Sequence, residues 1–228
     1  MAAPAPPAGT RGARRLSTGA RQWLVYLVGF MPAIYTFILG VLNELGADPV
    51  KALEHALGLW ALRFLILTLM ITPLAEIAGI RLIAYRRALG LLAFWYACLH
   101  LAAYLILDQQ LALAAITGDI VRRPYITVGM AAFALLVPLA VTSNNLSIRR
   151  LGRRWRQLHR LIYGAAALAA AHFIMVVKSW PPEPLVYGGI VFLLLAYRLV
   201  PQKVRRDIYH RLAGQQISTV TRSPGAES

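Results

Sequence analysis

Six long apolar runs constrain this chain more than any other feature of its sequence. Each is long enough, or nearly so, to cross a hydrocarbon core, which takes roughly 20 helical residues. Lipid offers the backbone no hydrogen-bond partners, so each run has to be helical. We therefore predict an all-α membrane protein, a bundle of six transmembrane helices at residues 23–43, 57–77, 87–107, 125–142, 159–177 and 184–200.

The composition supports a bilayer as the solvent of this chain. Of its 228 residues, 58% are hydrophobic and only 14% are charged, and the mean hydropathy is +0.58, which is too apolar for an ordinary soluble domain. The net charge of +15 does not indicate nucleic acid, because the basic residues occupy the short gaps between the apolar runs. We expect a lipid bilayer, and no nucleic acid, as a partner.

The basic residues in the connections predict the orientation. Most of them fall by parity on one side, in the N-terminal segment, the second and fourth connections and the C-terminal segment. The positive-inside rule then puts both termini in the cytoplasm. We expect a disordered basic tail at 1–20, a transmembrane domain at 21–205 and a cytoplasmic tail at 206–228. The opposite side holds only Lys51, Arg122, Arg123 and Lys178.

Several kinds of site are excluded. Cys98 is the only cysteine, so the chain has no intrachain disulfide and no cysteine-based zinc or iron–sulfur site. No nucleotide-binding glycine motif is present. Acidic residues are nearly absent from the helix centres, with Glu76 the closest case, which disfavours a proton-coupled transporter.

Two histidines interrupt the apolar segment RRWRQLHRLIYGAAALAAAHFIMVV. His159 and His172 are thirteen residues apart, so roughly 20 Å separates them along a helix. The third run also places a histidine, His100, thirteen residues beyond its inner end, at the depth of His172. Two imidazoles that face each other at one level are the axial ligands that a heme b needs. Small residues leave room for the porphyrin: Gly164, Ala165, Ala166, Ala167, Ala169, Ala170 and Ala171.

Each histidine also has a simpler interpretation. His100 and His172 can serve a proton relay or an interhelical hydrogen bond instead. His159 is either an inner-level ligand or an ordinary interfacial histidine, and on an ideal helix it points roughly 140° away from His172. We expect His55 just before the second helix, as a surface residue or cap, and His210 in a solvated basic tail.

Arginines and aromatic residues extend the candidate site. Arg63 is predicted five or six residues into the second helix, at the depth of His100, where it either pairs with a heme propionate or extends to the outer headgroups. Arg86 and Arg87 at the inner mouth can hold a propionate, a flavin phosphate or anionic lipid. Five aromatic residues either stack on a cofactor or belong to the interfacial belts: Trp95, Tyr96, Trp155, Tyr163 and Tyr187.

Four blocks carry a family resemblance: LGADPVKALEHALGLWALRFLILTLMITPL, RRALGLLAFWYACLHLAAYL, RRPYITVGM and RRLGRRWRQLHRLIY. In this order and spacing, over about residues 20–205, the chain resembles the heme-binding membrane subunits of bacterial periplasmic protein-methionine-sulfoxide reductase systems, within the ferric-reductase-like transmembrane superfamily. The resemblance implies a multi-pass b-type cytochrome of the inner membrane that also binds FMN. The heme-linked histidines of these subunits match His100, His159 and His172.

The resemblance also implies a place in electron transport. Such a subunit takes electrons from the quinol pool or a cytosolic flavin reductase. It delivers them to a periplasmic molybdopterin enzyme that repairs oxidised methionines, and it is not an enzyme by itself.

The chain departs from the wider superfamily in one respect. Larger members carry two histidines on each of two helices, whereas the inner counterpart of His100 would fall near Arg87, which cannot ligate iron. The sequence therefore supports one bis-histidine heme near the outer face. A second heme would need His159 together with an unusual second ligand, or with no second ligand. Alternatively, a flavin occupies the inner space. The alternatives in other classes are a self-contained transmembrane ferric reductase and a cofactor-free transporter with pore-lining histidines.

Overall fold

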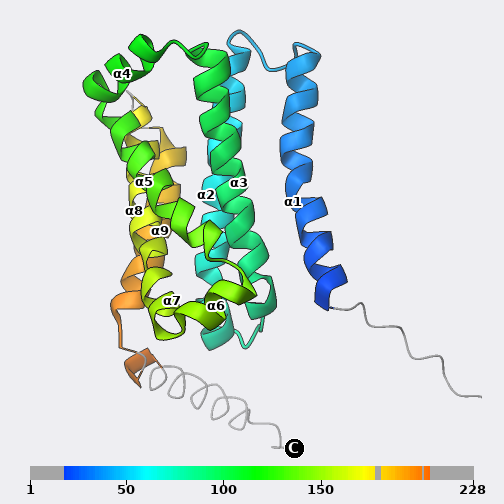
Figure 1. Ribbon diagram of the computed structural model, residues 1–228, viewed down its shortest axis with the longest axis vertical. Helices are drawn as coiled ribbons and strands as arrows, with labels where there is room; N and C mark the ends of the chain where they lie inside the picture. Colours follow the sequence, from blue (N-terminus) through cyan, green and yellow to red (C-terminus); the bar gives the residue numbers. More distant parts are fainter. Residues whose placement is uncertain (1–17, 178–180, 202, 206–228) are drawn as a thin grey trace, which may run out of the picture.

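The computed structural model describes residues 18–177, 181–201 and 203–205, and within these ranges the chain is built of helices and short connections without β-strand (Figure 1). The predicted tails lie outside the described residues, except that the first helix already begins at Thr18. The elements in chain order are α1 (Thr18–Val41), α2 (Pro49–Ile77), η1 (Ile83–Tyr85), α3 (Arg86–Ala103), the π-helix η2 (Tyr104–Asp108), α4 (Leu113–Arg122), α5 (Pro124–Val141), α6 (Asn145–Leu151), α7 (Arg153–Leu158), α8 (Leu161–Val176) and α9 (Pro182–Leu199).

The six predicted spans are confirmed. Six stretches of helix are long and apolar enough to cross a membrane: α1, α2, α3 with its flanking η1 and η2, α5, α7 with α8, and α9. The largest error is the start of α2, which begins at Pro49, eight residues before the predicted residue 57. Asp48 caps this helix, since its Oδ1 accepts a hydrogen bond of 3.0 Å from the Lys51 amide, and proline is favoured in the first turn.

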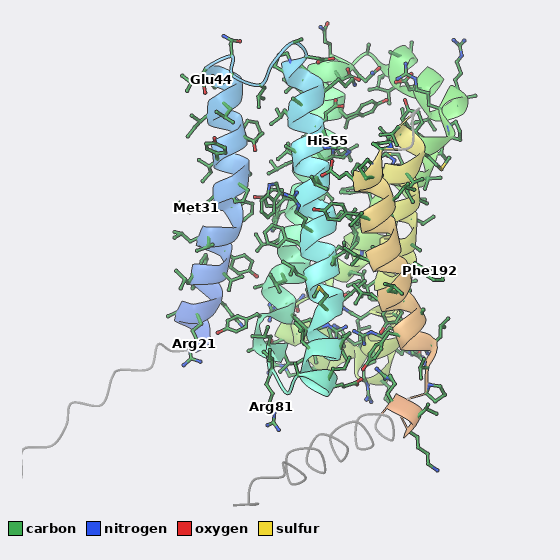
Figure 2. The ribbon with its side chains drawn as sticks, turned by 180° about the vertical axis from the view of Figure 1, so that it is seen from behind. Arg21, Met31, Glu44, His55, Arg81 and Phe192 are labelled. Atoms are coloured by element: carbon green, nitrogen blue, oxygen red, sulfur yellow. The ribbon has the colours of Figure 1, made fainter. Side chains whose placement is uncertain are left out.

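The bundle is organised around α2 and two tightly packed helix pairs. α2 packs most extensively against α3, and α5 packs against α8. α2 is also the most buried span and contacts α1, α8 and α9. Leu57, Leu69 and Leu92 are fully buried between these helices. On the outside, Met31 and Phe192 point away from the bundle with 59% and 69% of their surface exposed (Figure 2), as expected of side chains that face lipid.

The two ends of the bundle differ in structure and charge. The short helix α4 lies at one end, with Glu44 and His55, and the short helices α6 and α7 lie at the other, with Arg21 and Arg81 (Figures 1 and 2). We call these the α4 end and the α6–α7 end. The second of them carries a dense group of exposed arginines on its short helices: Arg149, Arg150, Arg153, Arg154 and Arg156.

Pro73 breaks the hydrogen-bond ladder of α2, and an arginine repairs it. A proline has no amide hydrogen, so the carbonyl of Leu69, four residues earlier, loses its normal donor. The Arg198 Nη2 of α9 donates to this carbonyl at 2.9 Å. α9 is therefore hydrogen-bonded to α2 at the one carbonyl that Pro73 leaves free.

A tyrosine hydroxyl joins α1 to α3 in a similar way. Tyr96 is fully buried, and its hydroxyl accepts from the Ala33 amide at 3.0 Å and donates to the Gly29 carbonyl at 2.7 Å. In a regular helix these two backbone groups would bond each other. Pro32, next to Ala33, opens this turn, and the hydroxyl bridges the gap.

Tyr96→Phe should destabilise the protein by about 1–3 kcal/mol, because both backbone groups lose a buried partner. The measurement is the apparent Tm of the purified protein in detergent. The control is Tyr35→Phe on α1, because the Tyr35 side chain is 63% exposed, and it should leave Tm unchanged. An unchanged Tm for Tyr96→Phe would mean that α1 closes its own turn and does not need the hydroxyl.

Candidate functional site

Two of the predicted histidines meet inside the bundle. His100 comes from the last turn of α3 and His172 from α8. Their ring centres are 6.2 Å apart and their planes are inclined by 73°. The expectation that these two residues reach the same depth on neighbouring elements agrees with this arrangement.

Both imidazoles are oriented by backbone carbonyls. The Nδ1 of His100 lies 2.8 Å from the Glu54 carbonyl oxygen, and the Nδ1 of His172 lies 2.7 Å from that of Tyr125. A carbonyl oxygen only accepts hydrogen bonds, so each Nδ1 carries the proton and donates it. Each Nε2 therefore keeps a free lone pair, which is the state of a histidine that ligates a metal.

The spacing of the two rings fits a metal between them. A metal–imidazole bond is about 2.0–2.1 Å long, and the ring centre lies roughly 1 Å behind the nitrogen. Two imidazoles on opposite sides of one iron therefore hold their ring centres roughly 6 Å apart. Among the described residues no group of three or more His, Cys, Asp or Glu side chains could hold a metal ion. A porphyrin would supply further ligands to a metal held by the two histidines.

The two histidines line a cavity of about 470 Å³ that opens near the α4 end, which we call the α4-end cavity. Its volume is in the range of cofactor pockets. α2, α3, α5 and α8 form its walls, with small residues beside the histidines: Gly58, Ala97, Gly129, Ala132 and Ala169. Its rim is polar, and charged side chains of the rim form ion pairs: the Lys51 ammonium lies 2.7 Å from the Asp108 carboxylate and 3.2 Å from that of Glu54.

A second cavity, also of about 470 Å³, lies near the α6–α7 end, and we call it the α6–α7-end cavity. Its walls are apolar and aromatic, with Phe94, Trp155 and Tyr163 among them. Its rim is strongly basic, and guanidinium groups of this kind bind phosphates and carboxylates. The arginines that line it are Arg86, Arg87, Arg156 and Arg160.

His159 belongs to this second cavity and is held differently from the other two histidines. The hydroxyl of Thr142 donates to the Pro138 carbonyl at 2.6 Å, so its oxygen accepts from the His159 Nε2 at 3.0 Å. The proton is therefore on Nε2, the reverse of the arrangement at His100. The ring also stacks on Trp155 at 3.9 Å. Iron ligation through Nε2 would require the bond to Thr142 to break.

The predicted depth of Arg63 is wrong. Because α2 begins at Pro49, Arg63 lies five residues beyond Gly58, the α2 residue beside the His100 Nδ1, and therefore roughly 7.5 Å deeper along the helix. Its Nε donates to the Tyr187 hydroxyl at 2.7 Å, and its guanidinium lies 4.8 Å from the Trp60 ring centre. The residues that line the α4-end cavity do not include Arg63.

The sequence placed His55 before its helix and missed the rim. His55 is a surface residue, as expected, with 51% of its side chain exposed, but it lies inside α2, lines the α4-end cavity and approaches Glu183 at 3.7 Å. The carbonyls of Glu54 and Tyr125 carry no signal in the residue type, so no pattern of side chains could have predicted them. The polar rim residues Lys51 and Asp108 follow from the position of His100 once the start of α2 is known.

Three of the five aromatic residues fit the two expected roles, and two fit neither. Trp155 and Tyr163 line the α6–α7-end cavity, whereas Trp95 is 51% exposed on the lipid-facing side. Tyr96 and Tyr187 contact α1 and Arg63, respectively, and line neither cavity.

Comparison with known proteins gives a consistent set of relatives. Residues 57–170 match the family model described as ferric reductase like transmembrane component. The chain is 63% identical over 183 residues to the protein-methionine-sulfoxide reductase heme-binding subunit MsrQ of Brucella anthropi, an alignment that covers 80% of this chain and 83% of that relative. It is 61% identical over 185 residues to the protein of the same name from Brucella ovis, covering 81% and 84%. No solved structure matches the chain significantly.

Arg63→Gln should leave the heme content of the purified protein unchanged, because the guanidinium does not reach the α4-end cavity. It should lower the stability by about 1–3 kcal/mol through loss of the bond to Tyr187 and the contact with Trp60. The measurements are pyridine hemochrome absorbance per chain and the apparent Tm. Tyr187→Phe removes the same hydrogen bond and serves as the matched variant. A loss of heme in Arg63→Gln, but not in Tyr187→Phe, would support the predicted contact between Arg63 and a heme propionate.

Proposed function

Since the chain belongs to the family of protein-methionine-sulfoxide reductase heme-binding subunits, we propose that it carries electrons through the membrane with a heme b held by His100 and His172. The observation that carries this proposal is the pair of facing imidazoles. Both line the α4-end cavity with ring centres 6.2 Å apart, and both are fixed by a carbonyl at Nδ1, which leaves each Nε2 unprotonated. A transporter that moves protons through histidines would gain nothing from this matched orientation.

The residues around the α4-end cavity suit electron transfer rather than chemistry on a substrate. When bound, a bis-histidine heme b takes up and releases single electrons. His100 and His172 would both hold the heme, so neither would be free to bind or activate a substrate. The apolar walls formed by Leu62, Leu65 and Leu136 would keep water away from the metal. The chain thus acts as a subunit of an oxidoreductase system rather than as the enzyme.

The charges at the two ends of the bundle support an orientation in the membrane, and with it a direction of electron transfer. The arginines of the α6–α7 end favour the cytoplasmic face of a bacterial inner membrane, with both termini on that side. The α4 end, with the histidine pair, then faces the periplasm. Electrons would enter from the quinol pool or a cytosolic flavin reductase. They would leave to a periplasmic molybdopterin-containing methionine sulfoxide reductase that repairs oxidised proteins.

The α6–α7-end cavity suits an FMN at the point of electron entry. Its four arginines can hold a phosphate, and Trp155 and Tyr163 offer aromatic faces to a flavin ring. Arg87 is positioned for this role by a hydrogen bond of 3.0 Å from its Nη1 to Asn145. In this assignment His159 is a neighbour of the flavin, and its stacking on Trp155 shapes the wall of the cavity.

His100→Ala and His172→Ala should each remove most of the heme, because a single remaining imidazole holds one face of the iron only. The measurements are the Soret band and the α-band after reduction by dithionite, per mole of purified chain. His210→Ala, in the predicted C-terminal tail, should keep the wild-type spectrum.

Three outcomes would contradict this proposal. A colourless wild-type protein would favour a cofactor-free transporter. Wild-type heme loading in both histidine variants would show that other residues ligate the iron. Reduction of ferric chelates by vesicles that lack the periplasmic partner would favour a self-contained ferric reductase.

Arg87→Gln should weaken FMN retention by roughly tenfold, the cost of one lost charge-assisted contact to a phosphate, and leave heme content unchanged. The measurement is flavin fluorescence released from the denatured protein, per chain. Arg81→Gln is the matched control, because Arg81 is exposed at the same end (Figure 2) and does not line the cavity. Equal FMN loss in both variants would mean that general charge, rather than this cavity, attracts the flavin.

A further inference from the structure

The two histidine-bearing halves of the bundle repeat the same local arrangement. In the first half, the Glu54 carbonyl of α2 accepts from His100, which lies 46 residues later on α3. In the second, the Tyr125 carbonyl of α5 accepts from His172, which lies 47 residues later on α8. These are also the two most tightly packed helix pairs of the described structure (Figure 1).

A glycine completes the arrangement in both halves. Gly58 stands four residues after Glu54, and Gly129 stands four residues after Tyr125. A Cβ at Gly58 would lie 3.0 Å from the His100 Nδ1, and a Cβ at Gly129 would lie 2.8 Å from the His172 Nδ1. Real Cβ atoms essentially never come as close as 2.8 Å, so a side chain at Gly129 would displace the His172 ring. The 3.0 Å at Gly58 is tighter than nine in ten real Cβ contacts, so the His100 ring would have to shift by a few tenths of an ångström.

The position of the glycine follows from helix geometry. In an α-helix the carbonyl of residue n accepts from the amide of residue n+4, and the side chain of n+4 lies on the same face. A carbonyl oxygen has a second lone pair, which an imidazole can reach only if the side chain of residue n+4 leaves room. Glycine is the one residue type that leaves the whole space open.

We infer that each half forms an imidazole cradle, defined as Glu54, Gly58 and His100 in one half and Tyr125, Gly129 and His172 in the other. Gly58 and Gly129 are positioning residues, since they allow the Nδ1–carbonyl bonds that direct each Nε2 toward the shared space. The inference rests on the proposed function for its consequence, which is that the glycines set how firmly, and at what ring angle, the heme iron is held. The offset between corresponding residues is 71, 71 and 72 positions, which makes the site a repeated two-helix unit.

The test pairs each glycine with its own histidine. Gly58→Ala and Gly129→Ala are made alone, with the histidine of the same cradle changed to alanine, and with the histidine of the other cradle changed to alanine. Gly189→Ala on α9 is the control, because nothing lies within 4 Å of a Cβ at that position. The readouts are heme retained per chain, the electron paramagnetic resonance spectrum of the ferric protein, which reports the relative angle of the two imidazole planes, and the apparent Tm of the heme-free protein.

We expect each single glycine variant to retain heme roughly 10- to 100-fold more weakly, the usual loss when a group that orients a metal ligand is disturbed. The resonance of the remaining ferric heme should shift. The lowering of Tm by Gly58→Ala should disappear in the His100→Ala background, where no ring is displaced, and persist in the His172→Ala background. Gly129→Ala should show the converse, and Gly189→Ala should match the wild type.

Two results would contradict the inference that the glycines position the imidazoles. One is an equal loss of Tm with and without the facing histidine, which would mean that the glycines serve helix packing alone. The other is wild-type heme retention and resonance in both glycine variants. The absence of heme from the wild-type protein would instead defeat the proposed function, and the Tm comparison on the heme-free protein would still decide whether the glycines seat the imidazoles.

Discussion

Backbone carbonyls with an unused lone pair are the acceptors on which the buried polar side chains of this bundle depend. Lipid leaves a polar group no partner other than the protein itself. The carbonyls of Glu54 and Tyr125 hold the two imidazoles, that of Leu69 holds Arg198, and that of Gly29 holds the Tyr96 hydroxyl. Because each acceptor belongs to a helix, the side chains are positioned by the most rigid part of the fold.

This dependence explains what the sequence could and could not predict. The six spans and the common depth of His100 and His172 follow from hydropathy and a fixed rise per residue, and the structure agrees with both. The depth of Arg63 failed because hydropathy does not mark where a helix begins when its first turns are polar, and the cap at Asp48 extends α2 by eight residues. The angle between His159 and His172 was not predictable from an ideal helix, since α7 ends at Leu158 and α8 starts at Leu161.

The two cavities present different chemistry at the two ends of the same bundle. One combines a facing pair of imidazoles with a rim whose charges are paired, and the other combines aromatic walls with a rim of four arginines. Leu65 and Leu136 line both of them, so a thin apolar layer separates the two spaces. In the proposed function an electron would cross such a layer while ions and water would not, so electron transfer need not compromise the barrier of the membrane.

α1 stands apart from both cavities. No described residue of α1 lines either of them, and α1 packs against α2, α3 and η1, with the Tyr96 hydroxyl bridging its open turn. The walls of both cavities are therefore formed by the other helices, so a displacement of α1 would leave these walls intact.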